Sequence, residues 1–173
     1  ESVEAAFKLA RYHTRRQHMI AFFGAFHGRT MGALSLTGSK MIQRRGFAPL
    51  IPQVTHIDYA NPYRSDGDAC LHTLNQLEDL FRRTVPPNEV AGIIVEPIQG
   101  EGGYIVPPPE FHRELKALAE KHGAILTQIS HLIDEALEER VRLEHVLTVY
   151  NVAGDAVARA AILDVLRGDA AEP

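Results

Sequence analysis

The amino-acid sequence predicts a mostly parallel α/β sheet followed by a C-terminal helical tail. Short apolar runs alternate with amphipathic helical segments along residues 1–126, which is the pattern of a sheet whose parallel strands are joined by helices. The clearest run, residues 91–95, consists of small and β-branched residues and is typical of a strand covered on both faces. After residue 126 the balance of Lys and Arg against Asp and Glu changes from 14 against 13 to 4 against 9. We therefore expect an α/β part over residues 1–126 and a divergent helical tail over residues 127–173.

The N-terminal part of the chain predicts a helix at residues 3–15, because Val3, Ala6, Phe7 and Ala10 follow helical spacing. A buried strand is expected at residues 19–23, closed by Gly24, and a short helix at residues 30–36. Residues 46–61 are loop-like, with a brief strand at residues 54–59.

The middle of the chain predicts a helix, a strand, a helix and the start of another strand. An amphipathic helix over residues 71–83 ends before Pro86 and Pro87. The strand at 91–95 follows it. Three prolines at 107–109 then open a helix over residues 110–121, which Gly123 closes as a left-handed cap. A further strand begins at residues 124–126.

The tail predicts two amphipathic helices. The first covers residues 130–147, and the second covers 155–167, with Asp155 as its N-cap and Gly168 just past its end. The apolar residues that define the first stripe are Ile129, Ile133, Ala136, Leu143 and Leu147. We expect this stripe to cover the α/β part or a partner copy.

Composition excludes several classes of function. The 173 residues, with 45% hydrophobic and 23% charged side chains, fit one soluble domain, or one domain with a helical extension. No apolar run is long enough to span a membrane, and no signal peptide is visible. The single cysteine, Cys70, favours the reducing cytoplasm. The chain begins with Glu, which suggests a fragment.

The charged residues and histidines indicate neither nucleic-acid binding nor a metal site. The basic pairs are isolated and are not set among aromatic residues, so we expect no nucleic-acid partner. The nine histidines lack the spacing of metal ligands, and no Cys-x-x-Cys occurs. The basic pairs are Arg15 with Arg16, Arg44 with Arg45, and Arg82 with Arg83.

Two motifs are candidates for chemistry. Residues 26–30 read Phe-His-Gly-Arg-Thr, and residues 95–103 read Val-Glu-Pro-Ile-Gln-Gly-Glu-Gly-Gly. Glu96 comes at the carboxyl end of a predicted parallel strand, where open α/β sheets bind ligands, and Gly28 lets the backbone pass close to a ligand. The alternative interpretation is that Phe26 is a core residue, His27 a surface histidine and Glu101 a solvated loop carboxylate.

Together these motifs resemble the class III aminotransferases, which use pyridoxal 5′-phosphate, and most of all the 4-aminobutyrate and other ω-amino acid aminotransferases. The resemblance covers residues 1–126. It implies part of a fold-type I large domain, a three-layer α/β/α structure, in a homodimer with an active site shared between subunits. It also implies transfer of an amino group from an amino acid to a 2-oxo acid. Amino-acid racemases of the same fold are the alternative, because both reactions begin with the same deprotonated adduct.

The resemblance also implies roles for individual residues. Phe26 matches the aromatic residue that stacks on the cofactor ring, with His27 and Gly28 behind it, and Glu96 matches a position near the cofactor. Glu101 matches a position on the substrate side, where the 4-aminobutyrate-type enzymes pair it with an arginine from a C-terminal domain.

Several parts of the family's cofactor site are missing from this sequence. The Gly-Ser or Gly-Thr pair that cradles the phosphate would precede Glu1, and Ile129 and Ser130 fall where the family has Asp and Glu. Asp134 and Glu135 resemble that pair displaced by five residues, but we interpret them as a solvated helix face.

No lysine follows Lys121, so no residue matches the family's catalytic lysine, which forms a Schiff base with the cofactor. We therefore expect this chain alone to be inactive. Its alternative role is that of a non-catalytic remnant that mediates association.

Overall fold

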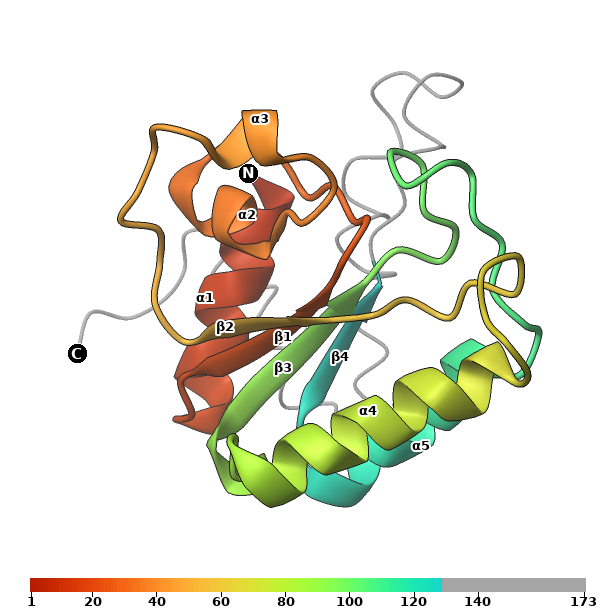
Figure 1. The fold of residues 1–173 in the computed structure, drawn as a ribbon. Coiled ribbons are helices and arrows are strands. Elements are labelled where there is room, and N and C mark those ends of the chain that lie inside the picture. Colours follow the sequence, from red (N-terminus) through yellow and green to blue (C-terminus); the bar gives the residue numbers. More distant parts are fainter. Residues whose placement is uncertain (129–173) are drawn as a thin grey trace, which may run out of the picture.

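The computed structural model describes residues 1–128, in which helices and strands alternate along the chain (Figure 1). The helices are α1 (Ser2–Thr14), α2 (Met31–Leu36), α3 (Met41–Arg44), α4 (Ala69–Arg83) and α5 (Phe111–His122), with a short 3-10 turn, η1 (Pro87–Glu89). The strands are β1 (His18–Phe22), β2 (Val54–Ile57), β3 (Val90–Val95) and β4 (Ile125–Gln128). The two helices expected in the tail lie outside the described residues.

The four strands form one parallel sheet in the order β2-β1-β3-β4. The register pairs Met19 with Val54 on one side of β1 and Ile20 with Ile93 on the other. Every residue of β1 and of β3 is buried, as the uninterrupted apolar runs predict for strands covered on both faces. The prediction of an interior strand at residues 91–95 is therefore confirmed.

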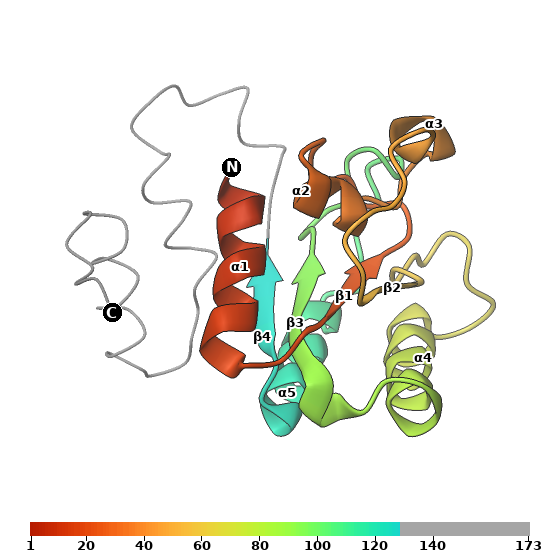
Figure 2. The ribbon, with the colours of Figure 1, turned by 90° about the vertical axis from the view of Figure 1, so that its left-hand side faces the viewer.

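Helices cover both faces of the sheet and give the three layers expected from the family resemblance. α1 and α2 pack on one face, and α4 and α5 pack on the other (Figures 1 and 2). Successive residues of β3 point to opposite faces of the sheet and pack into the hydrophobic core on each face. Ile93 packs with Leu77, Phe111 and others beside α4 and α5, whereas Ile94 packs with Phe7 and others beside α1 and α2.

Local signals explain where the helices begin and end. The Asp68 side chain accepts a hydrogen bond of 2.9 Å from the N–H of Leu71, so α4 begins at Ala69, two residues before the predicted start. Gly123 closes α5 with a φ of 66°, as predicted. Helix α3 was not predicted from the sequence, because four residues are too few to show a helical period.

Arg16 ties three elements together at the end of the sheet opposite the predicted site. Its Nη1 donates to the carbonyl oxygens of His122 at 2.8 Å, Gly123 at 3.0 Å and Val90 at 3.2 Å. The cation thereby satisfies carbonyls at the C-terminal end of α5, where the helix dipole favours positive charge.

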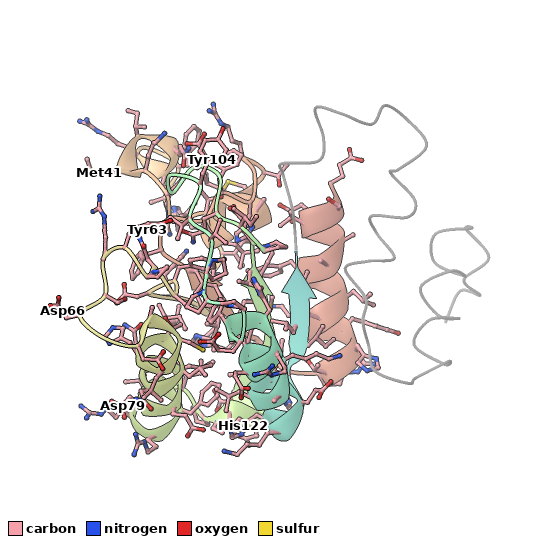
Figure 3. The ribbon with its side chains drawn as sticks, turned by 90° about the vertical axis from the view of Figure 1, so that its right-hand side faces the viewer. Met41, Tyr63, Asp66, Asp79, Tyr104 and His122 are labelled. Atoms are coloured by element: carbon pink, nitrogen blue, oxygen red, sulfur yellow. The ribbon has the colours of Figure 1, made fainter. Side chains whose placement is uncertain are left out.

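Large exposed side chains gather at the end of the molecule to which the strands point. Met41, Tyr63 and Tyr104 all lie toward that end in Figure 3, and each is at least two-thirds exposed. Among the helices of residues 1–128, none combines the length and apolar character needed to cross a bilayer. The same part of the chain holds no trio of His, Cys, Asp or Glu side chains placed to bind a metal ion.

Candidate functional site

The predicted site residues lie at the carboxyl ends of the two central strands. Phe26, His27 and Gly28 follow the turn after β1, and Glu96 comes directly after β3. Because β1 and β3 are parallel neighbours, their carboxyl ends meet at one edge of the sheet. The structure therefore brings together the two motifs that stand about seventy positions apart in the sequence.

The carboxylate of Glu96 joins the two motifs. Its Oε1 accepts a hydrogen bond of 2.7 Å from the N–H of Phe26, and its Oε2 accepts one of 3.0 Å from the N–H of Gly100. The residue is only 2% exposed. Burial raises the pKa of Glu96 above its ordinary value, and the two backbone N–H groups, which favour the ionised form, offset only part of that effect. Both oxygens of Glu96 thus hold protein backbone.

Gln99 makes a second connection between the same two loops. Its Nε2 donates to the carbonyl oxygen of Phe23 at 2.9 Å, and its backbone pairs with Ile105 in an antiparallel bridge. The side chain lies between two glycines. A Cβ on Gly24 would sit 2.5 Å from Gln99 Oε1, and a Cβ on Gly102 would sit 2.6 Å from it. The glycines at positions 24 and 102 therefore have a packing reason.

Tyr59 adds the carboxyl end of β2 to this arrangement. Its hydroxyl donates to the carbonyl oxygens of Glu96 at 2.9 Å and Pro97 at 3.1 Å. Burial, together with the nearby charge of Glu96, raises the pKa of Tyr59 well above its ordinary value, so the hydroxyl keeps its proton at neutral pH. We call Tyr59, Glu96 and Gln99 the strand-end clamp, since they fix the loops after β1, β2 and β3 relative to one another.

The first motif is a turn whose backbone is held by hydrogen bonds to the side chains of Glu96 and Thr37. Phe26 is partly buried, and its backbone is fixed by Glu96. His27 is 1% exposed, so the interpretation of this residue as a surface histidine is wrong. Its backbone N–H donates to Thr37 Oγ1 at 2.9 Å, and Thr37 Oγ1 also contacts the carbonyl oxygen of Gly28 at 3.1 Å. Gly28 has a φ of 120°, a conformation that favours glycine.

Glu101 has a partner that the sequence analysis did not predict. Its Oε2 lies 2.6 Å from Nζ of Lys40, and the two side chains are 42% and 57% exposed. An exposed pair of this kind contributes about 0–1 kcal/mol to stability. The pair nevertheless fixes the loop after β3 to the loop that precedes α3.

Glu4 was also missed as a site residue, although it supports the far end of the first motif. Its Oε1 accepts hydrogen bonds from Thr30 Oγ1 at 2.5 Å, from the N–H of Gly32 at 2.7 Å and from the N–H of Ala33 at 3.1 Å. Burial works to raise the pKa of Glu4, but these three donors outweigh it and lower the pKa. The carboxylate thus satisfies the N-terminus of α2, and a lone glutamate in an ordinary helical pattern gave no signal for this role.

The arrangement fits the ring of a planar cofactor in part. Phe26 is a partly buried aromatic residue at the carboxyl edge of a parallel sheet, and a buried carboxylate holds its backbone N–H. Lys40, the lysine nearest to the second motif, is paired with Glu101.

Comparison with known proteins gives a consistent result. A sequence model of the family described as Aminotransferase class-III matches residues 1–135. The match therefore continues beyond Leu126 and includes Asp134 and Glu135, which lie outside the described residues.

Individual relatives include both aminotransferases and racemases. The alanine/serine racemase of Pyrococcus horikoshii is 41% identical over 136 residues, covering 73% of this chain and 29% of the relative. The acetylornithine aminotransferase of Methanopyrus kandleri is 44% identical over 126 residues, covering 73% of this chain and 28% of the relative. The 4-aminobutyrate aminotransferase of Escherichia coli is 38% identical over 128 residues, covering 73% of this chain and 29% of the relative. The chain thus spans less than a third of the length of these relatives.

A solved structure shows the same fold. The (S)-enantioselective omega-transaminase of Thermomicrobium roseum superimposes with a TM-score of 0.68 and is 32% identical, over 73% of this chain and 30% of that chain.

Proposed function

This chain belongs to the class III aminotransferase family, and from this premise we propose that residues 1–128 form one wall of a pyridoxal 5′-phosphate site in an amino-acid-transforming enzyme. The observation that carries the proposal is the hydrogen bond from Phe26 N–H to Glu96, which fixes an aromatic residue at the carboxyl edge of the sheet. An aromatic ring held there suits stacking on a planar pyridine.

Each predicted site residue then has a task. Phe26 would lie against the cofactor ring, and Gly28 would let the backbone approach it. His27 and Thr37 hold the turn between them through the bond from His27 N–H. Glu96 would not contact the cofactor itself, because both its oxygens bind backbone N–H groups; its task is to position Phe26. Glu101 lies on the substrate side. When bound, pyridoxal 5′-phosphate supplies the electron-withdrawing ring that stabilises a deprotonated amino acid.

The reaction we propose for the whole enzyme is transfer of an amino group from an ω-amino acid, such as 4-aminobutyrate, to a 2-oxo acid. The similarity to aminotransferases acting on 4-aminobutyrate and acetylornithine supports it. The 41% identity to an alanine/serine racemase favours amino-acid racemisation as the second candidate. Incubation of the whole enzyme with one enantiomer of alanine distinguishes the two. Racemisation needs no 2-oxo acid, whereas amino transfer needs it in stoichiometric amount.

For this chain alone we propose a cofactor site that lacks the lysine needed for a covalent bond to the cofactor. No lysine follows Lys121 in the sequence, and Ile129 occupies the position expected for the acid that contacts the pyridine nitrogen. We propose that this chain alone does not catalyse amino transfer, and that its role outside catalysis would be association with other chains.

The proposal extends to the oligomeric state and the location of the protein. We propose a homodimer, supported by exposed apolar side chains on α2 and in the loop after β3, namely Met31, Tyr104 and Val106. We also propose a cytoplasmic protein, which the single buried thiol of Cys70 suits. Light scattering on the purified chain measures the first, and fractionation of cells that express the untagged protein measures the second.

Saturation-transfer NMR with pyridoxal 5′-phosphate tests the proposed site. We expect transfer between the cofactor ring and the aromatic protons of Phe26, and we expect Phe26→Leu to weaken binding at least tenfold while Phe47→Leu, an exposed control, leaves it unchanged. Borohydride followed by mass spectrometry should label no single lysine preferentially. Equal binding by the Phe26→Leu and Phe47→Leu variants would contradict the proposed wall, and one dominant labelled lysine would contradict the missing link.

A further inference from the structure

A long stretch of this chain contains basic side chains and no acidic one. Residues 5–57 contain no Asp and no Glu, yet they contain eight Lys and Arg side chains. These are Lys8, Arg11, Arg15, Arg16, Arg29, Lys40, Arg44 and Arg45. Two of them have structural tasks, because Arg11 and Arg16 donate to backbone carbonyls. The remaining cations give this part of the surface a positive potential that attracts anions.

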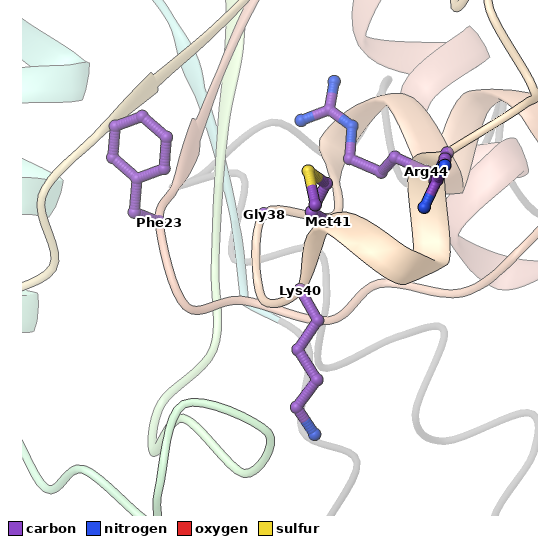
Figure 4. Close-up of a pocket in the computed structure, with 6 residues that line it drawn as sticks. Phe23, Gly38, Lys40, Met41 and Arg44 are labelled. Carbon is purple, nitrogen blue, oxygen red and sulfur yellow. The ribbon is translucent and has the colours of Figure 1, made fainter.

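Three of these cations line one open pocket of about 410 Å³. Its lining residues are Phe23, Gly38, Lys40, Met41, Arg44 and Arg45 (Figure 4). The volume lies within the range of about 300–1,000 Å³ that is typical of small-molecule sites. Phe23 and Met41 supply apolar surface, and they stand on opposite sides of the space in Figure 4.

The two arginines of this pocket have no acidic partner among the residues described. Lys40 directs its ammonium to Glu101 at 2.6 Å and extends away from Phe23 and Met41 in Figure 4. Arg44 and Arg45 make no ion pair with any described carboxylate, whereas the arginine pair on α4, Arg82 and Arg83, contacts Asp79. Two guanidinium groups at one pocket are matched to a carboxylate, which they bind through paired N–H donors.

The apolar wall of the pocket is firmly built. Phe23 stacks on His56, with ring centroids 5.5 Å apart and planes 29° apart. Gly38 passes so close that a Cβ there would sit 2.9 Å from the His56 ring, so the chain leading to α3 stays against this stack. His56 Nε2 is also hydrogen-bonded to the carbonyl oxygen of Leu36 at 3.0 Å. The wall of the pocket is therefore fixed, while one side of Phe23 remains exposed.

We propose that this pocket binds a small organic carboxylate with a hydrocarbon body, whose carboxylate pairs with Arg44 and Arg45 and whose chain lies on Phe23 and Met41. A ligand with charge alone would leave the apolar wall in water, and a neutral ligand would leave both guanidinium groups without an anion. The proposal does not rest on the amino-transfer function, because it uses none of the residues proposed to contact the cofactor.

Titration of the ¹⁵N-labelled 173-residue chain with hexanoate tests the proposal. We expect millimolar affinity, amide shifts centred on residues 38–47, and weaker binding at higher salt. Hexanol tests the charge, since it has the same chain without a carboxylate, and acetate tests the wall, since it has the carboxylate without the chain. Both should bind at least about tenfold more weakly than hexanoate.

The matched variants are Arg44→Gln with Arg45→Gln, and Arg82→Gln with Arg83→Gln. Both double variants remove two positive charges from exposed arginine pairs, but only the first changes the pocket. We expect the first to weaken hexanoate binding about tenfold or more and the second to change it less than twofold. Met41 is 79% exposed, so its side chain is not part of the core. Met41→Gln should weaken the binding of hexanoate but not that of acetate.

Three results would overturn the proposal: equal loss in both double variants, equal affinity for hexanoate and hexanol, or equal affinity for hexanoate and acetate. A fourth is a shift pattern that appears only together with a change in oligomeric state, measured by light scattering in the same samples. In that case the arginines would face a second copy of the chain.

Discussion

The carboxylate of Glu96 accepts a 2.7 Å hydrogen bond from the backbone N–H of Phe26, although the two residues are 70 positions apart. A residue that ends β3 thereby fixes the position of an aromatic residue that follows β1. The position of the Phe26 backbone depends on the whole strand-end clamp, because Tyr59 binds the carbonyl oxygen of Glu96 and Gln99 binds that of Phe23. The second motif therefore has a structural role of its own.

Replacement of Glu96 by glutamine should destabilise the chain by about 1–3 kcal/mol. The amide oxygen can still accept one N–H, but the NH₂ group then faces the N–H of Phe26 or of Gly100, and a buried donor is left without an acceptor. Urea unfolding followed by circular dichroism measures the change. Glu101→Gln is the matched control in the same motif, and we expect a loss of about 1 kcal/mol or less there, because its ion pair with Lys40 is exposed. Equal losses in the two variants would contradict the clamp.

The pH dependence of stability should separate Glu96 from Glu4. Burial raises the pKa of Glu96, so the stability linked to this group is fully present below the ordinary value of 4.5 and is lost as pH rises through the raised pKa. The hydrogen bonds to Glu4 outweigh its burial and lower its pKa, so its contribution is present above 4.5 and is lost as pH falls through the lowered pKa.

Urea unfolding over a pH series compares Glu96→Gln and Glu4→Gln with the parent chain. The first substitution should flatten the loss of stability above pH 4.5, and the second should flatten the loss below it. The prediction for these two residues is wrong if both variants keep the slope of the parent on both sides.

Replacement of Gly24 by alanine should cost more than the same change at Gly46. Both glycines have nearly the same positive φ, 84° and 88°, so the backbone penalty, about 1 kcal/mol, is shared. Only at Gly24 does the new Cβ meet another group, Gln99 Oε1 at 2.5 Å, whereas nothing lies within 4 Å at Gly46. We expect an additional loss of about 1–3 kcal/mol at Gly24. The double variant Gly24→Ala with Gln99→Ala should recover part of it, and failure to do so would show that the crowding lies elsewhere.

Replacement of Arg16 by alanine should destabilise the chain by about 1.5–3 kcal/mol, the value of hydrogen bonds to a charged group. The substitution leaves three carbonyls, on Val90, His122 and Gly123, without this donor. Arg16→Lys should recover less than half, because one ammonium lacks the planar fork of donors. Arg113→Ala on the exposed side of α5 is the control and should cost less than about 0.5 kcal/mol, because within residues 1–128 the guanidinium pairs only with the neighbouring Glu114. Hydrogen exchange at the C-terminal turn of α5 should rise only in the Arg16 variants.

The elements with strong periodic patterns were predictable from the sequence. The run of small and β-branched residues in β3 predicted a strand buried on both faces, and Gly123 predicted the end of α5, because each signal is local. The approach of Phe26 to Glu96 followed from the parallel topology together with the family resemblance.

What the sequence did not predict depends on contacts between distant residues. Glu4 gave no signal, because a glutamate in an amphipathic helix is ordinarily solvated, and only packing places Thr30 and α2 beside it. The ion pair of Lys40 with Glu101 spans 61 positions, and short α3 shows no period of its own. His27 was expected at the surface in one interpretation, and its burial results from the fold of the turn around Thr37.

The position of β1 between β2 and β3 has a consequence for the nascent chain. Ribosomes extend a chain by about 5–20 residues per second, so β1 waits roughly 4–14 seconds before its partner β3 has been synthesised. During that interval β1 can pair with β2 but not with β3, and its apolar residues Met19, Ile20, Ala21 and Phe22, buried in the finished sheet, remain open to other chains on one edge. Binding of β1 by chaperones should therefore end when translation has passed β3.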